Sequence, residues 1–237
     1  MRRFFKQVTV QDVSEGFAVF LDGRPLKNMA DGSEFLLPSF PAANLIAQEW
    51  NALPEEFNPS DFPKTRLMMG AAALKEEERL AVIDKILQAA ESDVLCFFAR
   101  FPEDLVRRQK ECWRPLVERM NAKGCDFEIR QDLSVGGLSS KTRDFLHRQL
   151  VQKDNIPLAC LQILSGIFDS VILSFFVEDG TLSAKEAFRL SCLEELYQNE
   201  KWPVDEEALS VRKGRESDAV LTAEILKAYE DKEKSGG

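Results

Sequence analysis

The chain has 237 residues, of which 44% are hydrophobic and 30% charged, and its formal net charge is −9. That composition is sufficient for a substantial packed core in one domain or in two smaller ones. Lys and Arg are dispersed among Asp and Glu, and no basic cluster adjoins aromatic residues, so nucleic acid is excluded as an expected partner.

Short strands are predicted at the start of the chain. The segments FKQVTV, GFAVFLDGRPLK and EFLLP have strand character, and Asp22 with Gly23 forms the turn of a hairpin. A helix is predicted after Ser39, with Trp50 on its apolar face. A sheet this small requires a covering helix, so residues 1–60 are expected to form a β-rich domain with an antiparallel meander.

Residues 61–237 are predicted to be almost entirely helical, which makes the fold class α+β. Pro115 predicts a break or kink in one of these helices, and the charged segment 231–237 is expected to be disordered. The predicted helices cover residues 75–95, 103–120, 140–150, 156–177 and 183–202.

Residues 156–177 are long enough to cross a bilayer and contain Asp169 as their one charge. A stripe of small and polar residues runs along this predicted helix, and no basic cluster flanks it. We therefore expect the central helix of a soluble domain and no membrane insertion. The N-terminal MRRFFKQVTV lacks the features of a signal or transit peptide and predicts a cytoplasmic protein.

The segment SAKEAFRLSCLEELYQNEKW, residues 183–202, places a carboxylate on an apolar stripe. Ser183 and Glu186 have the spacing of a capping box at the start of a helix. In one continuous helix Phe188, Glu195 and Trp202 lie on a single line, since they are seven residues apart. Glu195 then pairs with an Arg or Lys of its own chain, because buried charges are normally paired, or it contacts another protein.

Catalytic and metal-binding patterns are weak in this sequence. His147 lies among charged residues without a Cys or acid at ligand spacing. In VGGLSSKT, Ser140 occupies the place of the glycine that precedes Lys141 in a phosphate loop. The five cysteines are widely spaced, so we expect reduced packing residues. We therefore expect that the protein is not an enzyme and that it binds neither a metal ion nor a cofactor.

Seven short motifs occur in the order in which they are found in one protein family, the ATP12 family, which the chain resembles from Arg3 to Trp202. The motifs are RRFFKQVTV, GFAVFLDGRPLK, LPS before a helix ending in EW, FPKTRL, SDVLC, RRQKECWRPL and LEELYQNEKW. After FPKTRL this chain reads MMGAAAL, where relatives usually continue with polar residues.

The resemblance implies a bacterial assembly chaperone for the F1 sector of ATP synthase, and we expect the protein to be monomeric when free. It would bind the unassembled alpha subunit and shield its interface until alpha joins beta. By the resemblance, Trp50 and Glu195 match positions of the family motifs, and Glu195 matches an acidic position important for chaperone function. Further partner-binding candidates are Glu194, Phe188, Trp202, Arg66 and Lys64, and Arg66 and Lys64 are also candidates for pairing with Glu195. Residues of the family motifs with an expected structural role are Trp50, Asp22, Gly23 and Trp113.

Two other interpretations remain open. A general protein-binding adaptor or anti-aggregation factor would also require an exposed apolar surface. A small-molecule enzyme could use Glu195 with Asp169 or Arg66, and it would need a deep polar pocket in which titratable groups converge.

Overall fold

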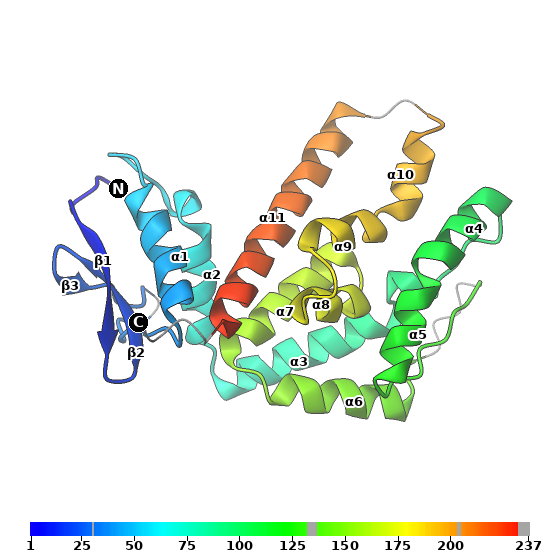
Figure 1. Ribbon diagram of the computed structural model, residues 1–237, viewed down its shortest axis with the longest axis horizontal. Helices are drawn as coiled ribbons and strands as arrows, with labels where there is room; N and C mark the ends of the chain where they lie inside the picture. Colours follow the sequence, from blue (N-terminus) through cyan, green and yellow to red (C-terminus); the bar gives the residue numbers. More distant parts are fainter. Residues whose placement is uncertain (30, 132–136, 203–204, 232–237) are drawn as a thin grey trace. The chain divides into compact units, whose positions relative to one another are not determined.

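The computed structural model describes residues 1–29, 31–131, 137–202 and 205–231. Its described parts form two compact units (Figure 1): unit 1 comprises residues 1–78, 155–157 and the segment from Glu224 onward, and unit 2 comprises 79–154 and 158–223. The division into a domain of residues 1–60 and a domain of residues 61–237 stays a prediction. Apart from Asp231, the tail predicted to be disordered lies outside the described residues.

The sheet of unit 1 is an antiparallel meander in the order β1-β2-β3, as the sequence predicts. Asp22 and Gly23 form the tight hairpin turn, and both have positive φ angles, +48° and +78°. The segment EFLLP makes isolated bridges instead of a full strand, one of them between Leu37 and Phe17. The strands are β1 (Val8–Val13), β2 (Gly16–Leu21) and β3 (Arg24–Pro25).

Helix α1 (Phe40–Asn51) packs against β1 and β2 and covers the sheet (Figure 1). The hydroxyl of Ser39 caps its first turn by accepting from the amide of Ala42. Trp50 is 4% exposed, packs among the rings of Phe5, Phe57 and Phe62, and donates from Nε1 to the hydroxyl of Thr65 at 3.0 Å. The core of unit 1 is therefore an aromatic cluster between the sheet and two helices.

At the centre of unit 2 lies α8 (Val171–Glu178), in which every residue from Val171 to Val177 is buried, in contact with α5 and α9 (Figure 1). The single helix predicted over residues 156–177 is wrong: two helices meet at Asp169, which has a left-handed φ of +50°. Ser170 then caps α8 by accepting from the amide of Leu173. Asp tolerates the left-handed conformation better than most residues, so the chain can end one helix there and begin the next.

Other predicted helices are present with altered ends. The helix predicted over 75–95 ends at Glu91. The break predicted by Pro115 occurs at Trp113. The remaining helical segments are η1 (Pro59–Asp61), α2 (Pro63–Ala72), α3 (Glu76–Glu91), η2 (Val94–Cys96), α4 (Glu103–Cys112), α5 (Arg114–Ala122), α6 (Ser140–Val151), α7 (Asn155–Phe168), α9 (Ala184–Ser191), α10 (Leu193–Asn199) and α11 (Glu206–Glu230).

None of the helices within the described ranges has both the length and the apolar character needed to cross a membrane. The apolar run at 156–177 instead supplies the interior of unit 2, where Leu158, Leu161, Leu164 and Phe168 are fully buried. All five cysteines are free thiols, of which Cys112 is exposed and the others are buried. The four buried cysteines are packing residues as predicted, whereas the exposed Cys112 is not.

Candidate protein-interaction site

The segment 183–202 begins as predicted but does not remain one helix. Ser183 and Glu186 form both hydrogen bonds of the capping box at the start of α9. The helix ends at Cys192, where the hydroxyl of Ser191 donates to the carbonyl oxygen of Phe188 at 2.9 Å. A side-chain hydroxyl bound to the backbone in this way favours bending or ending a helix.

This break separates the three residues that a continuous helix would align. Phe188 is buried in unit 2, Glu195 lies in the first turn of α10, and Trp202 lies beyond the end of α10 with 63% of its surface exposed. The predicted line of two rings above and below one carboxylate is therefore wrong. Glu195 remains at the surface, half-exposed.

Glu195 has a partner in its own chain. Its Oε1 accepts from the guanidinium of Arg212 in α11 at 3.0 Å, with side chains that are 44% and 18% exposed, respectively. This contact is the intramolecular pair that the sequence left open as one interpretation. Because Arg212 is mostly buried and Glu195 is half-exposed, the pair holds the carboxylate in one direction while water still reaches it.

A cavity of about 290 Å³ lies beside Glu195 in unit 2. Asp169 and Arg215 also line it, and Arg215 donates to the carboxylate of Asp169 at 3.1 Å and to the carbonyl oxygen of Ile167. Arg215 thereby satisfies a free carbonyl at the C-terminus of α7. Both carboxylates suggested for an enzyme share this cavity, but each already pairs with an arginine.

Polar contacts join α10 to α4, and the sequence analysis missed them. Glu194 accepts from the amide of Gln109 at 2.5 Å, and Glu200 accepts from both terminal nitrogens of Arg108 at 2.6 and 2.8 Å. Asp104 accepts from the hydroxyl of Tyr197 at 2.6 Å. More than 80 residues separate each donor from its acceptor, so helical periodicity carries no signal of these contacts. They hold α10 in place from the side of α4.

Lys64 and Arg66, suggested as partners of Glu195, have other contacts in unit 1. Lys64 pairs with Glu224 at 2.8 Å, and the exposed Arg66 donates to the carbonyl oxygen of Pro59 at 3.5 Å. Met68 and Met69, which follow in the segment that departs from the family pattern, are buried.

Trp50 and Trp113, the motif tryptophans with an expected structural role, are both interior. Trp50 belongs to the aromatic cluster of unit 1, and Trp113 is fully buried in unit 2, where its Nε1 donates to the carbonyl oxygen of Leu190 at 2.9 Å. At the hairpin, the carboxylate of Asp22 accepts from the amides of Lys6 and Gln7. These positions fix the two cores and the hairpin.

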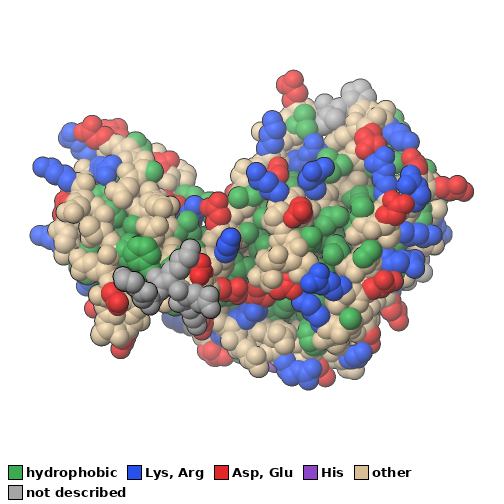
Figure 2. Space-filling view, viewed as in Figure 1, with side chains coloured by type: hydrophobic (Ala, Val, Ile, Leu, Met, Phe, Trp, Pro, Cys, Tyr) green, Lys and Arg blue, Asp and Glu red, His purple; other side chains and the backbone are tan. Residues whose placement is uncertain are grey.

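The visible face of unit 2 mixes charges of both signs with apolar side chains (Figure 2). Among the described residues, no three His, Cys, Asp or Glu side chains are arranged to hold a metal ion, and His147 is exposed. Gly136 of the segment VGGLSSKT lies outside the described residues, whereas Ser139 and Ser140 form the start of α6.

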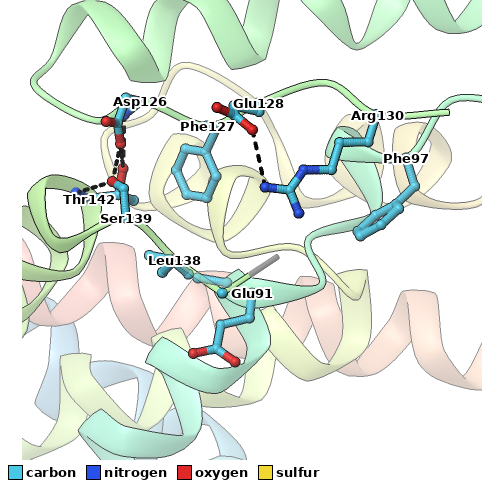
Figure 3. A pocket seen from close by; sticks show the side chains of 11 residues that line it. Glu91, Phe97, Asp126, Phe127, Glu128, Arg130, Leu138, Ser139 and Thr142 are labelled. Atoms are coloured by element: carbon cyan, nitrogen blue, oxygen red, sulfur yellow. Dashed lines mark hydrogen bonds and ion pairs between the residues drawn. The ribbon is translucent and has the colours of Figure 1, made fainter. Parts of the chain in front are cut away.

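A second cavity of unit 2, about 130 Å³, has a polar lining (Figure 3). Asp126 lies beside Ser139 and Thr142, whose hydroxyls donate to it, and these hydrogen bonds lower the pKa of the Asp126 carboxyl. On the other side, Glu128 pairs with Arg130. The hydrogen bonds of Asp126 connect the segment before α6 to the first turn of that helix. The Asp126 carboxylate therefore has a structural role.

Comparison with known proteins gives one consistent family. Residues 2–121 match the family profile described as ATP12 chaperone protein. The chain is similar to the mitochondrial protein atp12 of Schizosaccharomyces pombe, with 27% identity over 221 residues that cover 87% of this chain and 75% of the yeast protein.

Solved structures agree with the sequence match. The fold is similar to the crystal structure of Atp12 from Paracoccus denitrificans, with a TM-score of 0.89, 28% identity, and coverage of 96% of this chain and 98% of that one. It is also similar to a crystal structure of an Agrobacterium tumefaciens protein, with a TM-score of 0.88, 33% identity, and coverage of 96% and 85%.

Proposed function

Because this chain belongs to the ATP12 family of chaperones for assembly of the F1 sector of ATP synthase, we propose that its client is the unassembled alpha subunit. A free subunit of an oligomer exposes the partly apolar interface that it later buries, and such surfaces associate non-specifically unless they are covered. The chaperone covers that interface and loses it to the larger contact with beta. Exchange by competition requires no cofactor and no nucleotide hydrolysis.

Glu195 is proposed as the central client contact in unit 2. The supporting observation is its position: the carboxylate is 44% exposed and is held in one direction by Arg212. The contacts of Glu194 and Glu200 with α4 give α10 a rigid base. A charge oriented before binding loses less entropy when the client arrives.

The other proposed contacts differ in what they can offer. Trp202 is exposed, and exposed tryptophans are frequent anchors of protein interfaces. Glu194 keeps one oxygen on Gln109 and can present the other. Phe188 is buried, so it supports α9 and does not touch the client. On unit 1, Arg66 is exposed and can meet an acidic group of the client, whereas Lys64 is engaged by Glu224.

The test is co-purification of the tagged protein from its own cells, with mass spectrometry of the bound proteins. Wild type should enrich the alpha subunit, and Glu195→Lys should lose it while keeping the same melting temperature. Glu118→Lys is the matched control, since Glu118 is exposed on α5 of the same unit and does not line the Glu195 cavity. Wild type that never enriches alpha contradicts the proposed client.

A charge swap separates two roles of the carboxylate. In the double variant Glu195→Lys with Arg212→Glu, an ion pair can form again with its direction reversed. If Glu195 contacts the client, binding of alpha stays lost in the double variant. Recovery of binding would assign Glu195 to holding α10 against α11 and would contradict direct contact.

A further inference from the structure

Unit 1 contains a groove beside the β2–β3 hairpin, with a volume of about 520 Å³. Its floor is formed by the buried side chains of Phe5, Leu21 and Leu26. None of these residues belongs to the Glu195 site in unit 2. We call this feature the hairpin groove.

The rim of the hairpin groove contains an exposed aromatic ring. Phe4 is 72% exposed, and its ring meets the edge of the Phe5 ring with 5.4 Å between centroids. The apolar surface therefore continues from the floor onto the rim. Exposed apolar surface beside a groove with an apolar floor is typical of sites that bind another chain.

The rim of the groove is rich in basic residues, although the protein as a whole has a formal net charge of −9. Arg24 and Lys27 line the groove and are exposed, and no ion pair between described residues includes either of them. Lys27 faces Glu34 across an isolated bridge of the backbone without forming an ion pair with it. Two cations are thus available to a ligand.

Asp22 is the acidic residue of the rim, and its carboxylate is already hydrogen-bonded to the backbone. Its carboxylate accepts from the amides of Gln7 and Lys6 at 2.8 and 3.1 Å. Those hydrogen bonds, with the nearby charges of Lys6 and Arg3, hold the pKa of Asp22 below its ordinary value. Asp22 therefore organises the hairpin and stays ionised, so the charged residues that line the groove are two positive ones and one negative one, and the rim remains net positive.

From this combination we propose that the hairpin groove is a second protein-binding site, which takes a short apolar segment of a partner protein flanked by acidic residues. The apolar side chains occupy the floor and contact Phe4, and the acidic residues meet Arg24 and Lys27. Complementary rim charges select such a segment and speed its association. This site goes beyond the proposed function, because it lies in another unit and does not require Glu195.

The test uses two dye-labelled peptides with the centre Leu-Phe-Leu, one flanked by pairs of aspartates and the other by pairs of lysines. Fluorescence anisotropy with the full chain should show binding of the aspartate peptide and binding of the lysine peptide that is at least about tenfold weaker. Both peptides have the same apolar centre, so the difference between them measures the rim charges.

Matched variants locate the binding. The double variant Arg24→Glu with Lys27→Glu should bind the aspartate peptide about tenfold more weakly than wild type. The control is Lys85→Glu with Lys185→Glu, which changes the charge equally at exposed sites of unit 2 and should leave the affinity unchanged. Phe4→Ser should also weaken binding, and Phe101→Ser, which alters another highly exposed ring, should leave it unchanged. Circular dichroism checks that every variant is folded.

Three outcomes would overturn the assignment: equal binding of both peptides, full binding by the Arg24 and Lys27 double variant, or a dimer in sedimentation velocity that this double variant abolishes. The last result would give the groove to a second copy of the chain. Glu195→Lys should bind the aspartate peptide like wild type, so failure at the groove is distinguishable from failure of the proposed alpha-subunit contact.

Discussion

The α1–α2 region of unit 1 and the α10–α11 region of unit 2 each place a glutamate on a helix that also contributes to a core. In unit 1, the Glu49 carboxylate accepts from the amides of Lys64 and Thr65 and from the Thr65 hydroxyl, at 2.9, 2.8 and 2.6 Å. In unit 2, Glu195 accepts from one guanidinium and keeps much of its surface in water.

The difference between the two glutamates lies in how many of their hydrogen-bonding positions the fold uses. Glu49 satisfies orphan amides at the start of α2, a contact that folding itself requires. Glu195 has a single orienting partner and unused acceptor capacity. A charged side chain that the fold holds in place, but whose acceptor positions are not all used, is available for binding. Substitutions in the Glu49 region should therefore change the stability of the protein, whereas substitutions at Glu195 should change client binding.

The largest loss of stability is expected in the aromatic cluster beside Glu49. Trp50→Arg removes a buried ring and places an unpaired charge among Phe5, Phe57 and Phe62, so the free energy of unfolding should fall by at least about 4 kcal/mol. Urea denaturation measures this change. Trp202→Arg, at an exposed tryptophan, should change stability by no more than about 0.5 kcal/mol.

If Trp50→Arg does not fold at all, Trp50→Phe still tests the same contact. It keeps a ring but removes the Nε1 donor of the bond to Thr65, which should cost about 1–2 kcal/mol. A value near zero for Trp50→Phe would mean that the bond to Thr65 does not contribute to the stability of unit 1.

The second largest effect is expected at Asp93, a fully buried carboxyl of unit 2 that accepts from the amides of Leu95 and Ile172. Burial raises its pKa from 3.8 to about 6, against the opposing effect of these hydrogen bonds. A raised pKa means that the folded state binds the proton more tightly than the unfolded state. Asp93 therefore lowers stability as pH rises from about 4 to 6, by up to about 3 kcal/mol.

Asp93→Asn should remove this dependence, so its stability relative to wild type should improve between pH 4 and pH 7. Asp126→Asn should run nearly parallel to wild type between pH 4 and pH 7, because hydrogen bonds lower the pKa of Asp126 from 3.8 and its contribution is lost only as pH falls below that value. Parallel curves for wild type and Asp93→Asn in urea titrations across this range would refute the assignment to Asp93.

A smaller effect is expected at Glu49. Glu49→Ala leaves the first amides of α2 without their acceptor, and water can reach this partly exposed position, so stability should fall by about 1–2 kcal/mol. Gln48→Ala, one position earlier and exposed, is the control and should be nearly neutral. Equal stability of Glu49→Ala and wild type in urea denaturation would show that α2 does not depend on this cap.

Local features of the fold could be predicted because their signals span few residues. Asp22-Gly23 indicates a hairpin from two adjacent positions, and Ser183 with Glu186 indicates a helix start from positions three apart. The breaks at Asp169 and Cys192 could not be predicted in the same way. The apolar pattern continues across both of them, and the ends depend on hydrogen bonds that the pattern does not encode.

The candidate site was only partly predictable for the same reason. Glu195 is identifiable because a carboxylate on an apolar stripe conflicts with its surroundings. Its partner Arg212 lies in the next helix, and the bond from Gln109 to Glu194 joins positions 85 residues apart. Such contacts follow from the packing of helices, so the sequence alone gave Lys64 and Arg66 as candidates and missed Arg212.

Among the carboxylates compared, Glu195 should have the smallest effect on stability and the largest effect on client binding. Glu195→Lys breaks one half-exposed ion pair and brings two cations together, which should cost less than about 1 kcal/mol. Thermal unfolding should therefore be almost unchanged, while enrichment of the alpha subunit is lost. A large drop in melting temperature would instead mean that Glu195, like Glu49, has a structural role. Loss of binding would then reflect loss of structure.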